Sequence, residues 1–412
     1  MQPGNPSQTL PPLASPLRRR RVARSAAFGI GALLLVAALI ICAVVLGLGS
    51  EATRVFLTAL AVSSALSIVP LAILWYLDRR ERESPWLFAA AFLWGGLIAT
   101  AFALPANTAV IMAIAGWLEH NATIRDMLGP EAALMIGAPL AAPIVEETLK
   151  GLGVVLLFWL VRGEFDNVRD GFIYGALVGA GFNWFESALY VQQNFAQFGT
   201  APYGFQLGMR YAWLGLAGHA MFSGIFGASL GLARMGRRNG LRSLAPVAGY
   251  LLAVIAHAWN NVLPLLMALV AAQAGEAPPT EAQAPPELGL GEAMISASVS
   301  NLVIFLPFAL LLAWILRRSG RWERAVIREE LAGEVGGSVT AAEFEAIERD
   351  TTFRTRRIDA RDRAVSAALV NAQNELAFRK RRLRDRGFDP EQDPVVARRR
   401  EEVEALRGRL RA

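Results

Sequence analysis

Long apolar runs separated by short polar connections fill most of the chain. Eight of these runs have about 20 residues or more, the length that an α-helix needs to cross a bilayer. The runs cover residues 26–48, 55–77, 86–104, 132–161, 171–190, 211–232, 244–270 and 293–316. The pattern therefore predicts an all-α fold, a polytopic membrane helix bundle of about eight transmembrane helices.

Two other stretches differ from these runs. Residues 105–118 are apolar but too short to span alone, so they form either a re-entrant or interfacial piece or an extension of the third helix. Residues 317–412 are rich in charge and predict a cytoplasmic helical tail, while residues 1–25 predict a disordered basic arm. We thus expect a transmembrane domain over residues 26–316, flanked by this arm and this tail.

Composition and charge agree with a membrane protein. Of 412 residues, 54% are hydrophobic and only 18% are charged. The net charge is +6, but the arginines gather in alternate connections, as the positive-inside rule expects, rather than on one nucleic-acid-binding face. The chain should therefore be a multi-pass protein of the cell membrane with both termini cytoplasmic, no nucleic-acid partner, and a mobile outer loop over residues 271–292.

Helix signals subdivide the tail. Thr340 and Glu343 form a capping box, and Asp393 precedes a proline at a first helical position. An apolar stripe at helical spacing lies between these signals and consists of Val365, Leu369, Ala372, Leu376 and Leu383. The stripe suits self-association or packing on the membrane domain, with self-association favoured, and a solvated helix is the plainer alternative.

The predicted fourth span carries Glu146, Glu147 and Lys150, although each charged group costs about 2.5–3.5 kcal/mol at the centre of a bilayer. On a helix Lys150 lies within reach of both carboxylates, which leaves one carboxylate to spare. Glu186 lies in the fifth span after a ladder of glycines, His219 in the sixth, and His257 and Asn261 share a face of the seventh.

Counting residues along the spans allows these side chains to meet in one interior cavity. Carboxylates and imidazoles together either ligate a divalent metal such as zinc or deprotonate a water without one. Three interpretations are open: ordinary polar contacts between packed helices, a proton- or ion-coupled transporter, and a membrane-embedded hydrolase. The sequence shows no internal repeat and no paired broken helices of the kind found in transporters. His120 lies in an outer loop and is expected to be solvated.

The ordered motifs resemble those of a known family. Four motifs, in this order, are similar to those of the PrsW-type intramembrane proteases, within the CAAX endopeptidase-like superfamily. They are Glu146-Glu147-x-x-Lys150, Phe182-x-x-x-Glu186, the isolated His219 and His257-x-x-x-Asn261. The CAAX endopeptidases have a histidine where this chain has Glu186. The resemblance covers roughly residues 55–316.

The resemblance implies an intramembrane endopeptidase whose substrate is a single-span membrane protein, of the anti-sigma-factor kind. It implies that Glu146 is the general base, that Glu147 supports it, that Asn261 contributes a hydrogen bond and that Lys150 balances charge. It further implies that Glu186, His219 and His257 are metal ligands, with zinc as the metal, or partners of the water and the oxyanion. A non-catalytic membrane scaffold is the alternative that the same superfamily allows.

Overall fold

The chain is almost entirely helical. The computed structural model describes residues 20–411 except 48, 81–83, 162–164, 166, 236–238, 276–283 and 352–361. Within these ranges no strand is found beyond a single bridge between Val335 and Val339. Residues 1–19 of the N-terminal arm, several connecting arginines and the centre of the predicted outer loop lie outside the described residues. Residues 20–25, which were predicted to belong to the disordered arm, instead form the start of a helix. The predicted all-α fold is confirmed.

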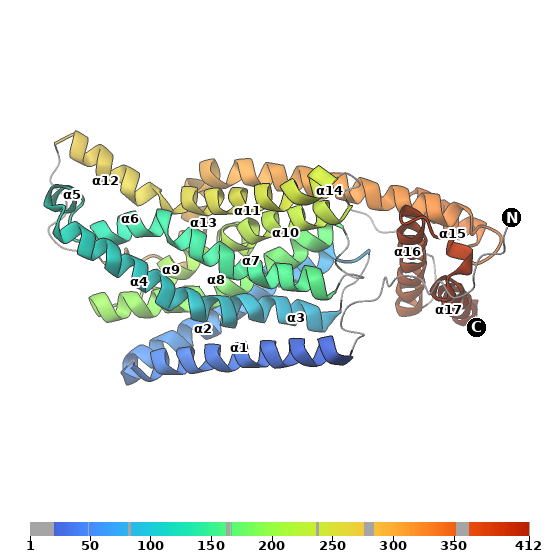
Figure 1. The fold of residues 1–412 in the computed structure, drawn as a ribbon, viewed down its shortest axis with the longest axis horizontal. Helices are drawn as coiled ribbons and strands as arrows, with labels where there is room; N and C mark the ends of the chain where they lie inside the picture. Colours follow the sequence, from blue (N-terminus) through green and yellow to red (C-terminus); the bar gives the residue numbers. More distant parts are fainter. Residues whose placement is uncertain are drawn as a thin grey trace. The chain divides into compact units, whose positions relative to one another are not determined.

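The chain forms two compact units. The membrane unit comprises residues 1–75 and 84–310, and the tail unit comprises residues 76–83 and 311–412. The helices of the membrane unit are α1 (Arg20–Gly47), α2 (Ser50–Leu77), α3 (Pro85–Leu93), α4 (Thr100–Glu119), α5 (Ala122–Leu128), α6 (Ala132–Leu140), α7 (Ala142–Leu160), α8 (Val168–Phe198), α9 (Tyr203–Arg210), α10 (His219–Met235), α11 (Asn239–Asn261), α12 (Leu263–Gln273) and α13 (Leu290–Ser300) (Figure 1).

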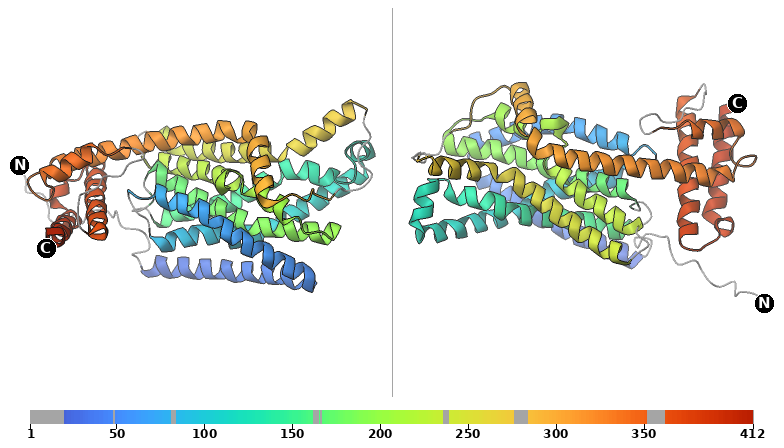
Figure 2. Two further views of the ribbon diagram at one scale, coloured as in Figure 1. Left: turned by 180° about the vertical axis from the view of Figure 1, so that it is seen from behind. Right: turned by 90° about the horizontal axis from the view of Figure 1, so that it is seen from above.

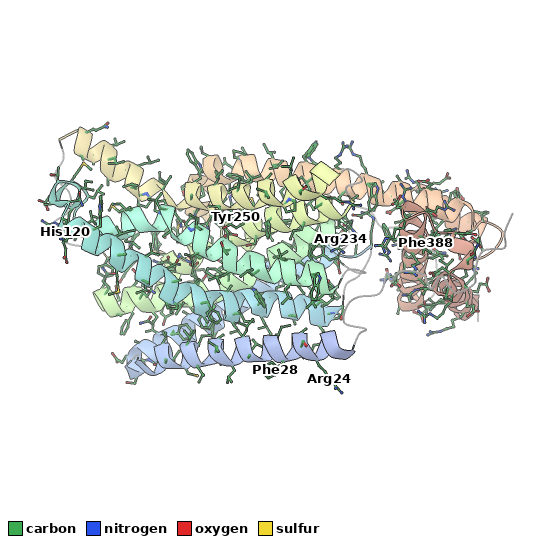
Figure 3. The ribbon with its side chains drawn as sticks, viewed as in Figure 1. Arg24, Phe28, His120, Arg234, Tyr250 and Phe388 are labelled. Carbon is green, nitrogen blue, oxygen red and sulfur yellow. The ribbon has the colours of Figure 1, made fainter. Side chains whose placement is uncertain are left out.

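This unit makes the chain a multi-pass membrane protein. Five of its described helices are long and apolar enough to cross a membrane, and two further pairs, α5 with α6–α7 and α13 with α14 (Leu302–Ala332), qualify as bent spans. The turn between α13 and α14 is visible in Figure 2. Apolar side chains face outward, as Phe28 on α1 shows with 81% of its surface exposed (Figure 3). The eight predicted runs thus correspond to five spans, two bent spans and α8.

Helix α8 is less apolar than the other spans because it is surrounded by protein. Its described residues from Arg169 to Phe185 are buried apart from Trp184, and it lies beside α10 (Figure 1). A Cβ atom at Gly175 or Gly179 would meet the carbonyl oxygen of Ser223 or His219 on α10. The glycine ladder therefore permits the close backbone approach that its spacing predicted, and it sets the position of the first turn of α10.

The stretch 105–118 extends the third span. Helix α3 passes through a π-helical turn, Trp94–Ala99, into α4, so that one helix of 35 residues runs from Pro85 to Glu119. A π-turn inserts an extra residue and rotates everything after it about the helix axis. The sequence left a re-entrant piece open for this stretch, and the structure resolves the choice in favour of an extension.

In the tail unit, α15 (Ala341–Glu348), α16 (Arg363–Asp385) and α17 (Pro394–Arg411) follow α14, and the predicted caps at Thr340 and Asp393 are confirmed. The predicted apolar stripe of α16 is buried inside this unit: Leu369 and Ala372 pack on Val403 of α17. The interpretation of the stripe as a self-association surface is therefore wrong, because the stripe forms the core of the tail itself.

Buried ion pairs join the tail helices and predict acid sensitivity. Lys380 and Arg400 bind the Glu334 carboxylate and lower its pKa to about 2. Since the pKa of Glu334 is about 4.5 when its partners are lost, this pairing stabilises the tail above pH 4.5 and ceases to do so as the pH falls from about 4.5 towards 2. We expect α16 amides of the full-length protein to exchange faster over this window after correction for the intrinsic rate. Glu334→Gln should flatten the response, and an equal response of the variant would contradict the assignment.

Candidate catalytic centre

Four helices of the membrane unit supply the predicted site residues. Glu146, Glu147 and Lys150 lie on α7 and Glu186 lies on α8. His219 is the first residue of α10, and His257 and Asn261 lie on the last turns of α11. All of them except Glu147 and Lys150 line one cavity, and those two lie directly behind its wall. The structure therefore brings the motif residues together.

Glu147 is a buried carboxylate whose oxygens are fully occupied. Its Oε1 accepts hydrogen bonds from Lys150 Nζ at 2.5 Å and His257 Nδ1 at 3.0 Å, and its Oε2 accepts one from Ser223 Oγ at 3.0 Å. Only 2% of the residue is exposed. Because both oxygens are hydrogen-bonded and buried, the geometry favours a role for Glu147 in orienting and neutralising its neighbours.

The contact with Glu147 orients His257. Because a carboxylate only accepts hydrogen bonds, Nδ1 of His257 must carry the proton, which leaves the lone pair of a neutral ring on Nε2. That Nε2 lies 3.9 Å from Glu146 Oε2. Stacking of the imidazole on Phe222, with ring centroids 5.1 Å apart, fixes the ring plane. His257 thus presents one unprotonated nitrogen toward Glu146.

His219 is held in a similar way, but with the roles of its two ring nitrogens exchanged. Its Nε2 donates to Glu186 Oε2 at 2.8 Å, so the lone pair is on Nδ1, which accepts from Lys150 Nζ at 3.0 Å and lies 3.9 Å from Glu146 Oε2. Each imidazole is therefore held by a carboxylate on one nitrogen and turns the other nitrogen toward the same point. Carboxylate–histidine pairs of this kind are typical of the outer shell of metal sites.

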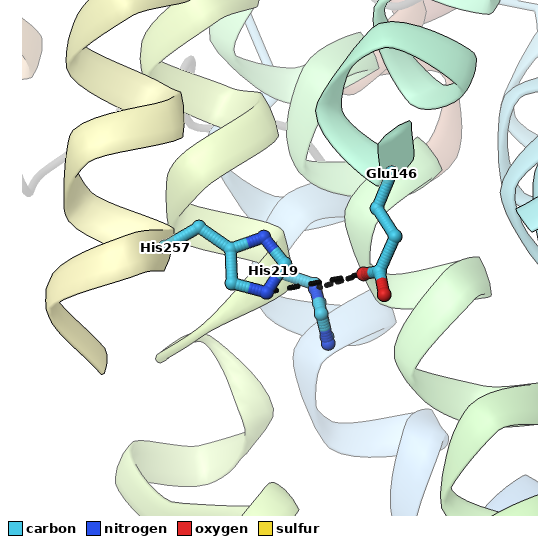
Figure 4. Close-up of side chains that lie close together, drawn as sticks. All are labelled: Glu146, His219 and His257. Carbon is cyan, nitrogen blue, oxygen red and sulfur yellow. Dashed lines mark ion pairs between the residues drawn. The ribbon is translucent and has the colours of Figure 1, made fainter. Parts of the chain in front are cut away.

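The carboxylate of Glu146 lies where the free nitrogens of the two imidazoles converge. Asn107 Nδ2 donates to Glu146 Oε1 at 2.9 Å, whereas Glu146 Oε2 is buried and has no hydrogen-bond donor among the described residues. The ligand atoms of Glu146, His219 and His257 all lie within 4.8 Å of one another, and Figure 4 shows both rings directed toward the carboxylate. An unpaired buried carboxylate oxygen is costly, so the geometry favours a cation or a polar reactant beside it.

The donor set fits a divalent metal. Two imidazole nitrogens and one carboxylate oxygen are the protein ligands of several catalytic zinc sites, which leave a further position open. Glu186 was predicted as a possible ligand, but its carboxylate faces the opposite nitrogen of His219, so Glu146 takes the third place in this cluster. Lys150 and a metal would compete for Nδ1 of His219. When a metal binds, Lys150 would therefore lose its hydrogen bond to His219 but would keep the one to Glu147.

Positive charge around the centre comes from two buried or half-buried cations. Lys150 is 0% exposed, lies 3.8 Å from Glu146 Oε2 and packs over the Phe182 ring. Arg210 of α9 lies 3.9 Å from Glu186 Oε2 and stacks on Tyr190. Three carboxylates and two fixed cations leave the site with a formal charge of −1 while both imidazoles are neutral. This excess suits a divalent cation.

The cavity at the centre has a volume of about 440 Å³. One wall is a helical stripe of α4, and the others come from α6–α8, α9, the start of α10, and the junctions of α11 with α12 and of α13 with α14. The stripe of α4 consists of Thr100, Ala103, Leu104, Asn107, Thr108 and Ile111. The cavity is thus more apolar than polar, but amide, hydroxyl and charged side chains line several of its walls in addition to the Glu–His–His cluster. Such a lining suits a chain segment that presents both apolar side chains and a polar bond to be broken.

A strained segment leads into His219. Trp213 and Leu214 have positive φ angles of 53° and 60°, a left-handed conformation that costs non-glycine residues of the order of 1–3 kcal/mol. Ser298 secures the turn, because Trp213 donates from its backbone nitrogen to Ser298 Oγ at 3.3 Å and from Nε1 to Ser298 O at 3.0 Å. This turn fixes where α10 begins and so where His219 lies.

Two other predicted positions have different surroundings. Asn261 lines the cavity, but its Nδ2 donates to Ala138 O at 3.0 Å, so it ties α11 to α6. His120 caps the end of α4, far from the centre, with Nδ1 3.1 Å from Gly116 O and its side chain exposed, in agreement with the expectation of a solvated histidine (Figure 3).

Two residues of the site were not singled out from the sequence. Asn107 binds Glu146, and Arg210 pairs with Glu186. An asparagine inside an apolar stretch was a usable signal for Asn107. Arg210 lies between α8 and the apolar run 211–232. Its position in the sequence therefore indicated a polar residue outside the membrane and gave no sign of a contact with Glu186.

Comparisons with known proteins agree with this geometry. Residues 83–278 match the model of the PrsW family intramembrane metalloproteases. The chain is 35% identical over 95 residues to Protease PrsW of Geobacillus kaustophilus (strain HTA426), a stretch that covers 23% of this chain and 38% of that relative. No solved structure matches the chain. Residues 83–278, which hold all the motif side chains described above, are therefore similar to the PrsW-type intramembrane metalloproteases.

Proposed function

We propose that the chain is an endopeptidase that hydrolyses a peptide bond of a membrane-tethered protein at the cluster of Glu146, His219 and His257. The observation that carries the proposal is the free Oε2 of Glu146, which faces two imidazole nitrogens, each set in place by another carboxylate. A structural contact between helices would need neither the unpaired oxygen nor the two orienting carboxylates, since a packed interior pairs its polar groups.

In the proposed reaction, Glu146 accepts a proton from the attacking water. The water oxygen bonds to the scissile carbonyl carbon while its proton passes to Glu146 Oε2. The carbon–nitrogen bond then breaks, and the same carboxyl returns the proton to the leaving nitrogen, giving a carboxylic acid and an amine, between which the remaining proton is exchanged. Asn107 holds the other oxygen of Glu146, and Glu147 and Glu186 hold the two imidazoles, so the reacting groups need no rearrangement.

Alternatively, Glu146 serves as a ligand instead of the base. Glu146, His219 and His257 are then the residues that would hold a divalent metal, and we propose zinc. Bound there, the metal would supply Lewis-acid polarisation of the scissile carbonyl. The role of the chain is to keep His219 Nδ1 and His257 Nε2 unprotonated and directed to one point. Metal analysis of the purified protein tests this: we expect one zinc per chain in the wild type and none in His219→Ala, whereas an active wild type without metal would contradict it.

The substrate class that we propose is a single-span membrane protein. The centre lies among membrane-spanning helices, and its cavity is walled mainly by apolar side chains, which suits a segment drawn from the bilayer. The resemblance of the motifs to PrsW-type proteases supports an anti-sigma-factor-like protein as the natural substrate.

We further propose that the protein lies in the cell membrane with both termini in the cytoplasm. The placement of arginine supports this orientation. A contact within the tail unit also supports it: Arg80, in the turn after α2, donates to Thr351 O at 2.7 Å, and Asn374 of α16 donates to Arg80 O at 2.8 Å. Because these contacts join Arg80 to the tail, they support a placement of both on one side of the bilayer.

Reconstitution separates a protease from a transporter. Purified wild-type protein in liposomes should cleave single-span test peptides and should not dissipate an imposed proton or sodium gradient. Gradient dissipation without cleavage of any test peptide would contradict the proposed function and would favour ion-coupled transport.

A further inference from the structure

A second unpaired acceptor lies beside the catalytic centre. Among the described residues that line the cavity, two buried side-chain oxygens have no hydrogen-bond donor: Glu146 Oε2 and Asn107 Oδ1. The reaction proposed above uses the first of these oxygens and leaves the second unexplained. A buried amide oxygen without a donor is destabilising, so Asn107 Oδ1 requires an explanation.

The orientation of the Asn107 amide follows from its partner. Glu146 Oε1 accepts a hydrogen bond at 2.9 Å, and only the NH₂ group of an asparagine can donate one. A flipped amide would set its oxygen against a carboxylate oxygen. Asn107 Oδ1 is therefore the atom directed away from Glu146, and its amide plane is fixed by the residue that we propose as the base.

The position of Asn107 on α4 places its side chain in the lining of the cavity. Asn107 belongs to the stripe that runs from Thr100 to Ile111 along one wall. The stripe begins directly after the π-turn Trp94–Ala99, which sets the rotation of this part of the helix. The remaining side chains of the stripe are apolar or threonine, so Asn107 is the amide of this wall nearest to the reacting carboxylate.

The chemistry of the substrate supplies the missing donor. In a spanning helix every backbone N–H is paired within the helix, and a peptide bond can be attacked only after the chain around it has unwound. Unwinding releases N–H groups into a cavity where an unpaired donor is costly. We propose, on the basis of the proposed function, that Asn107 Oδ1 accepts a hydrogen bond from a backbone N–H of the unwound substrate next to the cleaved bond.

This assignment gives Asn107 two tasks at once. Its NH₂ group holds the base, and its oxygen holds the substrate, so one amide sets the distance between the attacking water and the bond to be cleaved. The recognised group is the peptide backbone, and the contact is therefore independent of the substrate's side chains.

A double-mutant cycle between enzyme and substrate tests the proposal. The probe is a fluorogenic single-span peptide that the wild type cleaves in liposomes, together with variants in which one backbone amide flanking the cleaved bond is replaced by an ester, which removes one N–H. We expect wild-type kcat/KM to fall about tenfold at one ester position. Asn107→Ala should lose at least about tenfold on the all-amide peptide and should show no further loss at that position.

Controls separate this contact from a general defect. Asn121→Ala removes an asparagine from the turn between α4 and α5, where its amide donates to Trp117 O at 2.9 Å. This variant should behave as the wild type does on every peptide. Asn107→Ala should retain the metal content of the wild type. Asn107→Leu, which keeps the volume of the side chain, replaces the alanine variant if that variant does not fold.

Two results would overturn the proposal in different ways. If wild type and Asn107→Ala lose the same factor at every ester position, the hydrogen bond to the substrate does not exist, while the proposed protease function stands. If the wild type cleaves no single-span peptide at all, the proposed function fails and this inference fails with it.

Discussion

Glu146→Gln is expected to lower kcat for cleavage of a single-span peptide by about 10⁴-fold. The substitution keeps the shape of the side chain but removes the proton acceptor and the negative charge that faces His219 Nδ1 and His257 Nε2. The variant should insert and fold as the wild type does, because the amide can still accept from Asn107. Initial rates in liposomes, with thermal unfolding in detergent as the folding measure, check this expectation.

A matched carboxylate outside the centre serves as the control for Glu146. Glu119 is exposed at the end of α4, and Glu119→Gln should leave the rate of cleavage unchanged. Retention of more than a few per cent of wild-type activity in Glu146→Gln would remove Glu146 from the reaction and would transfer the role of base to another group.

Glu147→Ala is expected to destabilise the membrane unit by about 3–5 kcal/mol, the largest stability effect of any single change in the centre. It leaves the ammonium of Lys150 and the N–H of His257 buried without their acceptor. It also frees the His257 ring, so metal affinity should fall by about 10–100-fold. Denaturant unfolding in detergent and metal titration measure the two effects.

The double substitution Glu147→Leu with Lys150→Leu distinguishes charge pairing from packing. Removal of both charges should recover part of the lost stability, because the Lys150 ammonium is no longer left without Glu147, although Glu146 loses its nearby cation. It should not recover cleavage, because His257 still lacks its orienting partner. A Glu147→Ala variant as stable as the wild type would show that Lys150 and His257 do not depend on Glu147.

Much of the fold, and most of the residues that form the site, could be predicted from the sequence. Hydropathy placed the spans, the glycine ladder of α8 marked its contact with α10, and motif order brought Glu146, Glu186, His219 and His257 to one cavity. These features are local patterns, or they follow from helices that are adjacent in the chain, and both kinds of information can be read from residue spacing.

The division of roles within the centre could not be read in the same way. Either Glu146 or Glu186 could join His219 and His257 in the Glu–His–His cluster, depending on which imidazole nitrogen of His219 faces which carboxylate. That in turn depends on the rotation of α10 about its axis. The π-turn before α4 sets the rotation that brings Asn107 to Glu146. The backbone hydrogen bonds that define a π-turn cannot be predicted from the spacing of apolar and polar residues. Asn261 pairs with a backbone carbonyl, Ala138 O, which no side-chain pattern reveals.

The tail illustrates a different limit. An apolar stripe shows that a helix face is covered, but not what covers it. The stripe of α16 packs on Val403 of α17 within the same unit, and this pairing depends on a turn between the two helices whose geometry the stripe does not encode.

Product analysis in ¹⁸O-labelled water tests the central claim most directly. Wild-type protein and His257→Ala are reconstituted side by side with the same single-span peptide, and the products are identified by mass spectrometry. We predict that the wild type forms two fragments, with one ¹⁸O in the new carboxyl terminus, and that His257→Ala leaves the peptide intact. Labelled fragments formed at the wild-type rate by His257→Ala, or an intact peptide after incubation with the wild type, would contradict hydrolysis at this centre.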